Sequence, residues 1–225
     1  MAEIQDACKK RSCRLSRMGC VDFTEASQLQ DELQRLRQAN KTSDVILFLE
    51  HPPVITIGIA GGEQNVIIPR DILAQEGIPI SHTDRGGSVT YHGPGQLIVY
   101  PIIDLNSAGL NIHTFMLNLE EAIIRVLNDF SIAGHRNPQY PGVWVEQQKI
   151  GAIGVRVRHW ITKHGVALNV NNDLKPFSYI HACGIEDKGV TSMRQLLGHE
   201  VDREDVIRSM IDHFSQVFDM SIIEQ

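Results

Sequence analysis

The sequence predicts an α+β domain, of the mixed α/β kind, with a largely antiparallel sheet flanked by helices. Two long segments, 112–130 and 202–218, repeat apolar residues at spacings of three and four, as amphipathic helices do. Three short segments, 143–145, 150–157 and 162–170, are apolar, extended and joined by polar turns, which is typical of an antiparallel meander. With 225 residues the chain is long enough to form one large domain.

The first part of the chain predicts one helix and two strands. Val21 to Arg37 has apolar residues three and four apart, which indicates a helix. Val45 to Leu49 is continuously apolar and predicts a buried strand, and Val54 to Ile57 predicts a second one. Pro52 and Pro53 cannot sit in a central ladder, so the chain bends between these strands.

Shorter elements fill the remaining stretches. Residues 58–64 read as a loop, Pro69 to Gln75 as a short helix, and Leu97 to Ile103 as a buried strand. Residues 192–197 predict a helical turn after a Thr/Ser cap. Because no repeat or linker interrupts the chain, we expect a single domain over 15–225, preceded by a basic and flexible tail over residues 1–14.

Composition and charge narrow the class of protein. A net charge of -6 and a pI near 5.9 argue against a broad nucleic-acid-binding face. No stretch approaches the ~18 apolar residues of a membrane span, and the first residues do not resemble a secretion signal, so we expect a cytoplasmic protein. The cysteines at positions 8, 13, 20 and 183 form no disulfide framework and no metal-ligand spacing, so we expect reduced thiols and no metal.

A glycine-rich stretch, Arg85 to Gln96, leads directly into the strand that begins at Leu97. It holds four glycines, one proline and the pair Arg85 and His92, a composition typical of a loop through which a backbone approaches a ligand. An ordinary hairpin turn explains the same composition equally well.

Two residues outside that stretch could carry covalent chemistry. Cys183, in His-Ala-Cys-Gly-Ile, is a candidate nucleophile, although this residue taken alone favours a buried structural cysteine. Its base could be a histidine, with His92, His164 and His181 in suitable contexts, or Lys149 at the end of a polar turn. The glycines after Lys149 match neither a dinucleotide-binding motif nor a P-loop, so nucleotide binding has no support from motifs.

Six segments together resemble the octanoyltransferase family of lipoate biosynthesis, also called lipoate-protein ligase B. The resemblance runs from about residue 15 to about residue 218, and its segments are 49–54, 83–97, 142–145, 149–156, 164–169 and 182–185. It implies the fold of biotin and lipoate protein ligases, with a mixed sheet around an acyl tunnel. It also implies transfer of an octanoyl group from acyl carrier protein to a lysine of a lipoyl domain, or of the glycine cleavage H protein, through an acyl-enzyme thioester.

The resemblance carries the family's site residues onto this chain. It places the acyl-bearing cysteine at Cys183 and the activating lysine at Lys149, with His164 in a supporting role. The implied substrate contacts are Arg85, Gly86, Gly87, Ser88, Val89, Thr90, Tyr91, His92, Ala152, Ile153, Gly154, Gly165, Val166 and Ala167. The chain departs from the family at Ala182, where proline is common, and at Ile59, where arginine is usual.

We therefore expect a monomeric acyltransferase that needs no metal or nucleotide cofactor and binds neither nucleic acid nor membrane. Two alternatives stay open. One is an ATP-dependent lipoate or biotin ligase of the same fold, and the other is a non-catalytic protein that binds lipoyl domains or acyl carriers.

Overall fold

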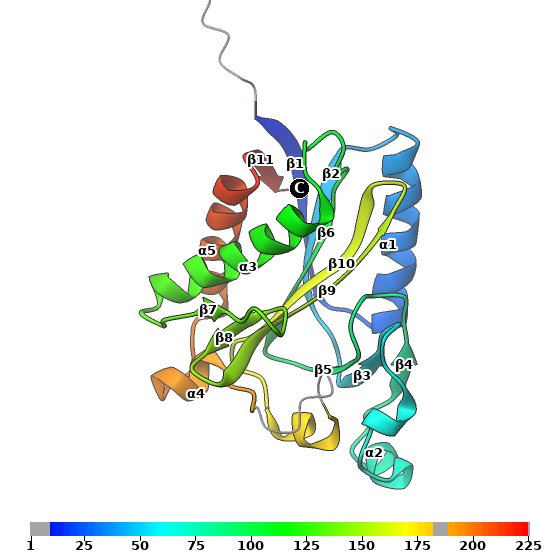
Figure 1. The fold of residues 1–225 in the computed structure, drawn as a ribbon, viewed down its shortest axis with the longest axis vertical. Helices are drawn as coiled ribbons and strands as arrows, with labels where there is room; N and C mark the ends of the chain where they lie inside the picture. The colour runs from blue at the N-terminus through cyan, green and yellow to red at the C-terminus, as the bar shows by residue number, and fades with distance from the viewer. Residues whose placement is uncertain (1–9, 182–188, 225) are drawn as a thin grey trace, which may run out of the picture.

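The computed structural model describes residues 10–181 and 189–224, which form two sheets flanked by helices (Figure 1). The strands of the large sheet, in pairing order, are β11 (Met220–Glu224), β1 (Arg11–Cys20), β2 (Asp44–Glu50), β6 (Gln96–Ile102), β10 (Ile161–Asn169), β9 (Gln148–Arg158), β8 (Val143–Val145) and β7 (His135–Arg136). The small sheet consists of β4 (Ile80–His82), β3 (Val54–Ile57) and β5 (Val89–His92). The helices are α1 (Phe23–Gln38), α2 (Arg70–Gln75), α3 (Ile112–Asp129), α4 (Met193–Leu197) and α5 (Arg203–Val217), with 3-10 turns η1 (Glu63–Asn65) and η2 (Lys175–Tyr179).

The prediction of a largely antiparallel sheet is confirmed. From β2 to β7 every neighbouring pair in the large sheet is antiparallel. β1 is the exception, because it runs parallel to both β2 and β11. The meander predicted from the sequence corresponds to β8, β9 and β10.

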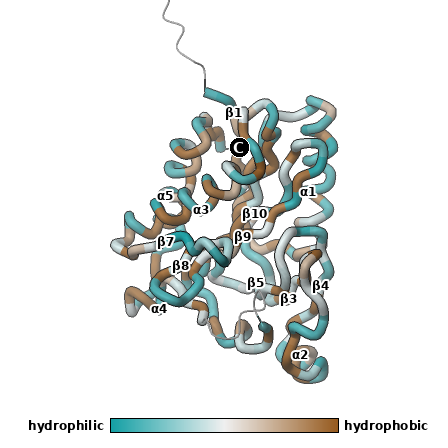
Figure 2. Tube along the Cα trace, in the orientation of Figure 1, coloured by the Kyte–Doolittle hydropathy of each residue, from teal (hydrophilic) through white to brown (hydrophobic). Residues whose placement is uncertain are grey.

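Helices cover both faces of the large sheet (Figure 1). α3 and α5 pack on one face over a core that includes Phe115 and Phe214, and α1 packs on the other face, where its Ala26 meets the strands. A third cluster, which contains Tyr91 and Phe177, lies beside the small sheet. Figure 2 shows hydrophobic segments along the central strands and hydrophilic turns along α1.

Polar residues fix where the helices begin. The side chain of Asp22 accepts hydrogen bonds from the first turn of α1, and Asp202 does the same for α5. Asn111 and Ser192 cap α3 and α4 in the same way. Each such cap contributes about 1 kcal/mol to stability.

The predicted boundary of the basic tail is wrong for Arg11 to Arg14, which belong to β1. In this strand Cys13 and Leu15 point into the core while their neighbours remain at least partly accessible, an alternation that suits one buried face. The burial of Cys13, together with the nearby Asp44 carboxylate, raises the pKa of the Cys13 thiol well above its usual range. Cys20 is exposed, and Cys8 lies outside the described residues.

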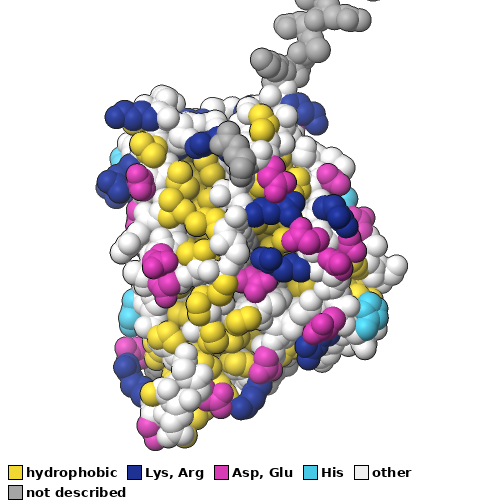
Figure 3. All heavy atoms as spheres, turned by 180° about the vertical axis from the view of Figure 1, so that it is seen from behind, with side chains coloured by type: hydrophobic (Ala, Val, Ile, Leu, Met, Phe, Trp, Pro, Cys, Tyr) yellow, Lys and Arg dark blue, Asp and Glu magenta, His cyan; other side chains and the backbone are white. Residues whose placement is uncertain are grey.

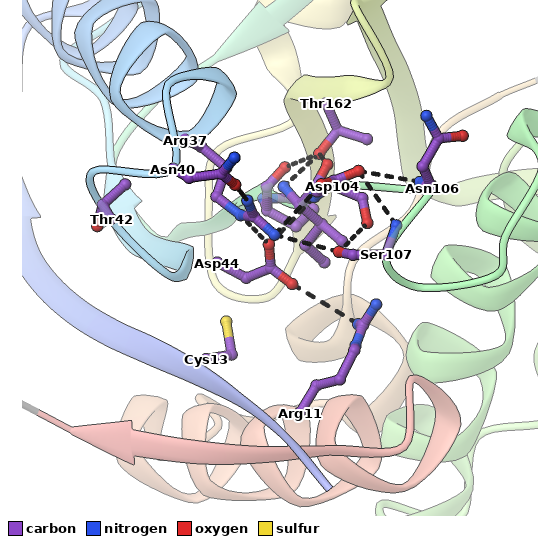
Figure 4. A network of polar contacts seen from close by, with 12 residues as sticks. Arg11, Cys13, Arg37, Asn40, Thr42, Asp44, Asp104, Asn106, Ser107 and Thr162 are labelled. Carbon is purple, nitrogen blue, oxygen red and sulfur yellow. Dashed lines mark hydrogen bonds and ion pairs between the residues drawn. The ribbon is translucent and has the colours of Figure 1, made fainter.

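A polar network closes one end of the large sheet (Figure 4). The buried carboxylate of Asp44 accepts from Arg37 Nε at 2.8 Å and from the backbone N–H of Asp104 at 3.1 Å. Arg37 also contacts the Asp104 carboxylate at 3.4 Å, and Arg11 approaches Asp44 at 3.7 Å. The network thereby joins α1, β1, β2 and the segment after β6.

The surface carries no single dominant charge on the face shown in Figure 3, where basic and acidic side chains are interspersed. Arg17, for example, contacts both Glu204 and Glu224. Within the described ranges, no helix has the length and apolar character that a membrane crossing requires.

Candidate active site

A cavity of about 630 Å³ lies over the large sheet, beside β5 and the loop that precedes it. Its floor is formed by β9 and β10, which contribute the small residues Ala152, Gly154, Gly165 and Ala167 together with Ile153, Val155 and Val166. The loop Arg85 to Ser88 covers these residues, so the glycine-rich stretch and the two later strands meet here. This volume suits a small-molecule ligand.

The loop is held by the buried side chain of Arg85. Its guanidinium donates to the carbonyls of Thr56 at 2.7 Å, Ser88 at 2.9 Å and Gly86 at 3.0 Å, and also to the hydroxyl of Thr56. Arg85 thus ties the loop to β3, in the small sheet, and several of its N–H groups are already bonded to the protein and are not available to a ligand. We interpret it as a residue that shapes the cavity wall.

Gly154 allows the loop to lie directly on β9. The backbone N–H of Gly86 donates to the carbonyl of Val155 at 2.9 Å. A Cβ atom on Gly154 would lie 2.9 Å from the Gly86 carbonyl oxygen and 3.1 Å from Arg85 Cδ, closer than a side chain permits. Glycine is required at this position by the close approach of two backbones.

The predicted contact at Tyr91 is not borne out by the geometry, because Tyr91 is absent from the cavity lining. Residues 89–92 form strand β5, in which successive side chains alternate between faces. Thr90 and His92 face the cavity and Val89 reaches its edge, whereas Tyr91 packs edge-on against Phe177 in the cluster beside the small sheet. Its burial raises the pKa of Tyr91 to about 12.

His92 is fixed by buried amides. Its Nδ1 donates to Gln96 Oε1 at 2.8 Å, and Gln96 Nε2 in turn donates to Asn169 Oδ1 at 2.8 Å. Asn169 Nδ2 continues the chain to the carbonyl of Thr191 at 3.0 Å. Since an amide oxygen can only accept, Nδ1 of His92 carries the proton and Nε2 does not. Desolvation lowers the pKa of His92 well below its usual value, so the ring is neutral.

His164 lies at a strained point of β10. Its backbone φ is 61°, in the left-handed region, and its N–H donates to Gln30 Oε1 at 2.7 Å. Its Nε2 donates to the Asp84 carboxylate at 2.8 Å, while its Nδ1 has no hydrogen-bond partner among the described residues. Burial lowers the pKa of His164, against the opposing effect of Asp84. The Asp84 pKa is held well below its usual range by that hydrogen bond.

Lys149 lies at the opposite end of the cavity floor, near the start of β9. Its Nζ is 4.8 Å from the centre of the Trp144 ring, a cation–π contact. Its backbone pairs with the segment that follows residue 188, since its N–H donates to Gly189 and its carbonyl accepts from Thr191, both at 3.0 Å.

Cys183 lies outside the described residues, so its position stays a prediction. The residues that flank this segment are described, and both flanks are held beside the cavity. On one side His181 N–H donates to the carbonyl of Asn65 at 2.8 Å, and on the other side Thr191 pairs with Lys149. Asn65 and Lys149 both line the cavity.

The cavity lining includes Lys149, His164 and all the predicted substrate contacts except Tyr91. Sequence reasoning did not select Phe23, Gln96, Tyr100 or Asn169, which also line it. Gln96 and Asn169 lie within the segments that resemble the family, so their polar side chains could have been predicted to line the site. Phe23 gave no such signal, because it reads as an ordinary apolar residue of a helix.

The described residues contain no group of three or more histidine, cysteine, aspartate or glutamate side chains placed to hold a metal ion. The absence of a cofactor requirement stays a prediction.

Comparison with known proteins connects this geometry to a family. The model of the lipoyl protein ligase A/B catalytic domain matches residues 22–215. The octanoyltransferase of Caldicellulosiruptor saccharolyticus is 48% identical over 200 residues, which cover 88% of this chain and 85% of that protein. The octanoyltransferase of Desulforamulus reducens is 42% identical over 206 residues, which cover 91% and 90%. Lipoate-protein ligase A bound with ATP has the same fold, with a TM-score of 0.73 at 15% identity over 96% of this chain and 88% of that one.

Proposed function

Because the chain belongs to the lipoyl protein ligase A/B catalytic domain family, we propose that it is an octanoyltransferase with acyl carrier protein as donor and lipoyl-domain lysines as acceptors. The relatives named octanoyltransferase make this chain an acyltransferase. The observation that carries the finer proposal is the placement of Lys149, and of both flanks of the Cys183 segment, at one cavity with a floor of small residues.

In the first half-reaction Nζ of Lys149 accepts the proton of the Cys183 thiol. The thiolate attacks the carbonyl carbon of the octanoyl thioester, and backbone N–H groups near Cys183 hold the oxyanion. The bond to the carrier sulfur then breaks, and the carrier thiolate leaves with the proton from Lys149. A thiolate suits this step because it is both a soft nucleophile and a good leaving group.

In the second half-reaction the neutral amine of the acceptor lysine attacks the octanoyl-Cys183 thioester. Lys149 accepts a proton from the attacking nitrogen, and the Cys183 thiolate leaves and is reprotonated. The products are an amide and the free enzyme thiol. No ATP is consumed, because the thioester supplies the driving force.

The cavity supplies the binding energy for the acyl chain. Burial contributes about 0.8 kcal/mol per methylene, or about 5 kcal/mol for an octanoyl chain. Gly154, Gly165, Ala152 and Ala167 add little side-chain volume to the floor.

Intact-mass spectrometry tests the proposal. After mixing with octanoyl-acyl carrier protein, the wild-type chain should gain one octanoyl group that hydroxylamine removes. Cys183→Ala should gain none, whereas Cys20→Ala, which removes an exposed thiol elsewhere, should acylate normally. A normal adduct on Cys183→Ala would refute the assignment of the nucleophile.

Lys149→Ala tests the base. This variant should still bind octanoate but lose most of its turnover, because the thiol proton then has no acceptor. If Lys149→Ala turned over at the wild-type rate, the base would have to be a histidine and not Lys149.

The same assays separate the two alternatives. An ATP-dependent ligase would transfer octanoate only when ATP is added and would not use the carrier thioester. A non-catalytic binding protein would bind donor or acceptor without forming an acyl-enzyme. Gel filtration checks the prediction of a monomer.

A further inference from the structure

Phe23, the first residue of α1, closes one end of the cavity. Its side chain is 5% exposed and lines the cavity. Its ring lies parallel to two other rings of the lining, with centroid distances of 6.2 Å to His92 and 6.4 Å to His164. His51 meets it edge-on at 5.3 Å. This cluster of rings, which we call the end wall, also includes Tyr100, 6.0 Å from His164.

The strand register places the end wall far from Lys149. Ala152 pairs with Ala167 and Gly154 pairs with Gly165, so the floor continues along β9 and β10 away from Lys149. At about 3.3 Å per residue, Lys149 and Gly154 are about 16 Å apart along the strand. Gly165 directly follows His164, a member of the end wall, so the wall stands at the level of Gly154.

The rings of the end wall are shielded from solvent, because Phe23, His92, Tyr100 and His164 are all buried. The exposed lining residues lie elsewhere, Gln139 and Pro141 near Lys149 and Ala60 and Gly87 at the loop. Because the proposed chemistry takes place beside Lys149, the far end of the acyl chain meets the buried rings.

The end wall is suited to an apolar group, because most of its polar atoms are occupied. Tyr100 Oη lies 2.8 Å from His51 Nε2, and His51 Nδ1 lies 2.7 Å from the carbonyl of Val21. His92 and His164 are bound to Gln96 and Asp84. Desolvation lowers the pKa of His51, His92 and His164, so these rings are uncharged.

Eight carbons fit the distance between the two ends. With C–C bonds of about 1.5 Å, an extended octanoyl chain spans about 9 Å. The remaining ~7 Å of the interval, taken from the strand rise, is left for the Lys149 side chain and the thioester group of the substrate. Two more methylenes would bring the chain into the ring of Phe23.

We propose that Phe23 sets the upper length of the acyl chain by standing across the end of the cavity. The inference rests on the proposed octanoyl transfer for its substrate class. It assigns chain-length selection to a residue of α1, outside the glycine-rich loop and the strands that carry the chemistry.

Transfer from carrier proteins loaded with six, eight, ten or twelve carbons tests this assignment. The wild-type kcat/KM should be highest with eight carbons. Phe23→Leu and Phe23→Ala should raise the ratio of ten-carbon to eight-carbon kcat/KM by about 15-fold, the factor for burying two more methylenes. Phe23→Trp should shift the preference towards six carbons, because the larger ring shortens the cavity.

Phe218→Leu is the matched control. Phe218 is also 5% exposed but packs in the core under α3 and α5, so its loss should leave the chain-length ratio unchanged. A ratio for Phe23→Ala and Phe23→Leu within about twofold of wild type, when the variants are folded by circular dichroism, would overturn the proposal.

Equilibrium binding of free fatty acids keeps this inference separate from the proposed function. If the wild-type protein transfers no acyl chain from any donor, the proposed function fails. The affinity series for octanoate, decanoate and dodecanoate still decides the role of Phe23, because tighter binding of the longer acids by Phe23→Leu needs no transfer chemistry. Equal affinity profiles for both proteins would reject it.

Discussion

Thr162 replaces a missing backbone hydrogen bond in the large sheet, and its removal should be costly. β6 contains Pro101, which has no N–H to give to its neighbour β10. The hydroxyl of Thr162 donates to the Pro101 carbonyl at 2.6 Å and accepts from the Ile103 N–H at 2.8 Å. Thr162, which is labelled in Figure 4, is buried together with Ile103, and both are 0% exposed, so no water can take over these bonds.

Thr162→Val keeps the shape of the side chain but leaves two buried backbone groups unpaired. Each of the two unsatisfied groups costs about 1–3 kcal/mol, and the added methyl returns about 1 kcal/mol, so the free energy of unfolding should fall by about 1–5 kcal/mol. With a urea m-value of about 2–3 kcal/mol/M, the midpoint of unfolding should fall by about 1 M.

Urea unfolding followed by tryptophan fluorescence measures this change, since Trp144 is 1% exposed in the folded chain. Thr162→Ser is the control, because it keeps the hydroxyl and loses one methyl, which costs about 1 kcal/mol. If the valine variant were as stable as the serine variant, the hydroxyl would not hold β6 to β10 in the way described.

Three further changes follow from the geometry. Burial lowers the folded-state pKa of His51, His92 and His164 below the unfolded value of about 6.5. The unfolded chain therefore binds more protons below that pH, and the free energy of unfolding should fall between pH 7 and pH 5 by up to about 1.4 kcal/mol per unit for each ring. Urea titrations should show a shallower slope for His92→Asn, and an unchanged slope would contradict this. A Cβ on Gly154 would lie 2.9 Å from a backbone oxygen of the loop. Gly154→Ala should therefore slow octanoyl loading about tenfold while iodoacetamide labelling of the site thiol stays normal. Equal slowing of both reactions would indicate general misfolding. His159 lies in the two-residue turn between β9 and β10 and has a φ of 51°, a conformation that favours asparagine. His159→Asn should therefore stabilise the folded chain by about 0.5–1 kcal/mol and raise the urea midpoint. A lower midpoint would contradict backbone strain at this turn.

Local patterns predicted most elements of the fold. The apolar runs that became β2 and β6, and the periodicity of α3 and α5, depend on neighbours in the sequence, and each was found close to its expected position. β1 was missed because its arginines read as a tail, although Cys13 and Leu15 carry the alternation of a strand. β1 and β11 gain their stability from pairing with each other across nearly the whole chain, and local sequence does not report such pairing.

The part of the candidate site that lies in sequence motifs could be predicted. Arg85 to His92, Ala152 to Gly154 and Gly165 to Ala167 converge on one cavity, with Tyr91 the exception. The error at Tyr91 arises because the glycines made the stretch read as a loop, whereas four of its residues form a strand with two faces. Phe23 could not be predicted, because its contacts with His92 and His164 join segments far apart in the chain.

The pairing of β1 with β11 has a consequence for synthesis on the ribosome. β1 can join β2 as soon as both have emerged, but its other edge has to wait for residues 220–224. Until then the edge of the sheet is the 10-residue strand β1 and not the 5-residue strand β11, and a longer open edge is the kind of surface through which chains associate wrongly. A ribosome-bound chain that stops before β11 should therefore be more prone to aggregation than the finished protein, even though the cavity residues have all been made.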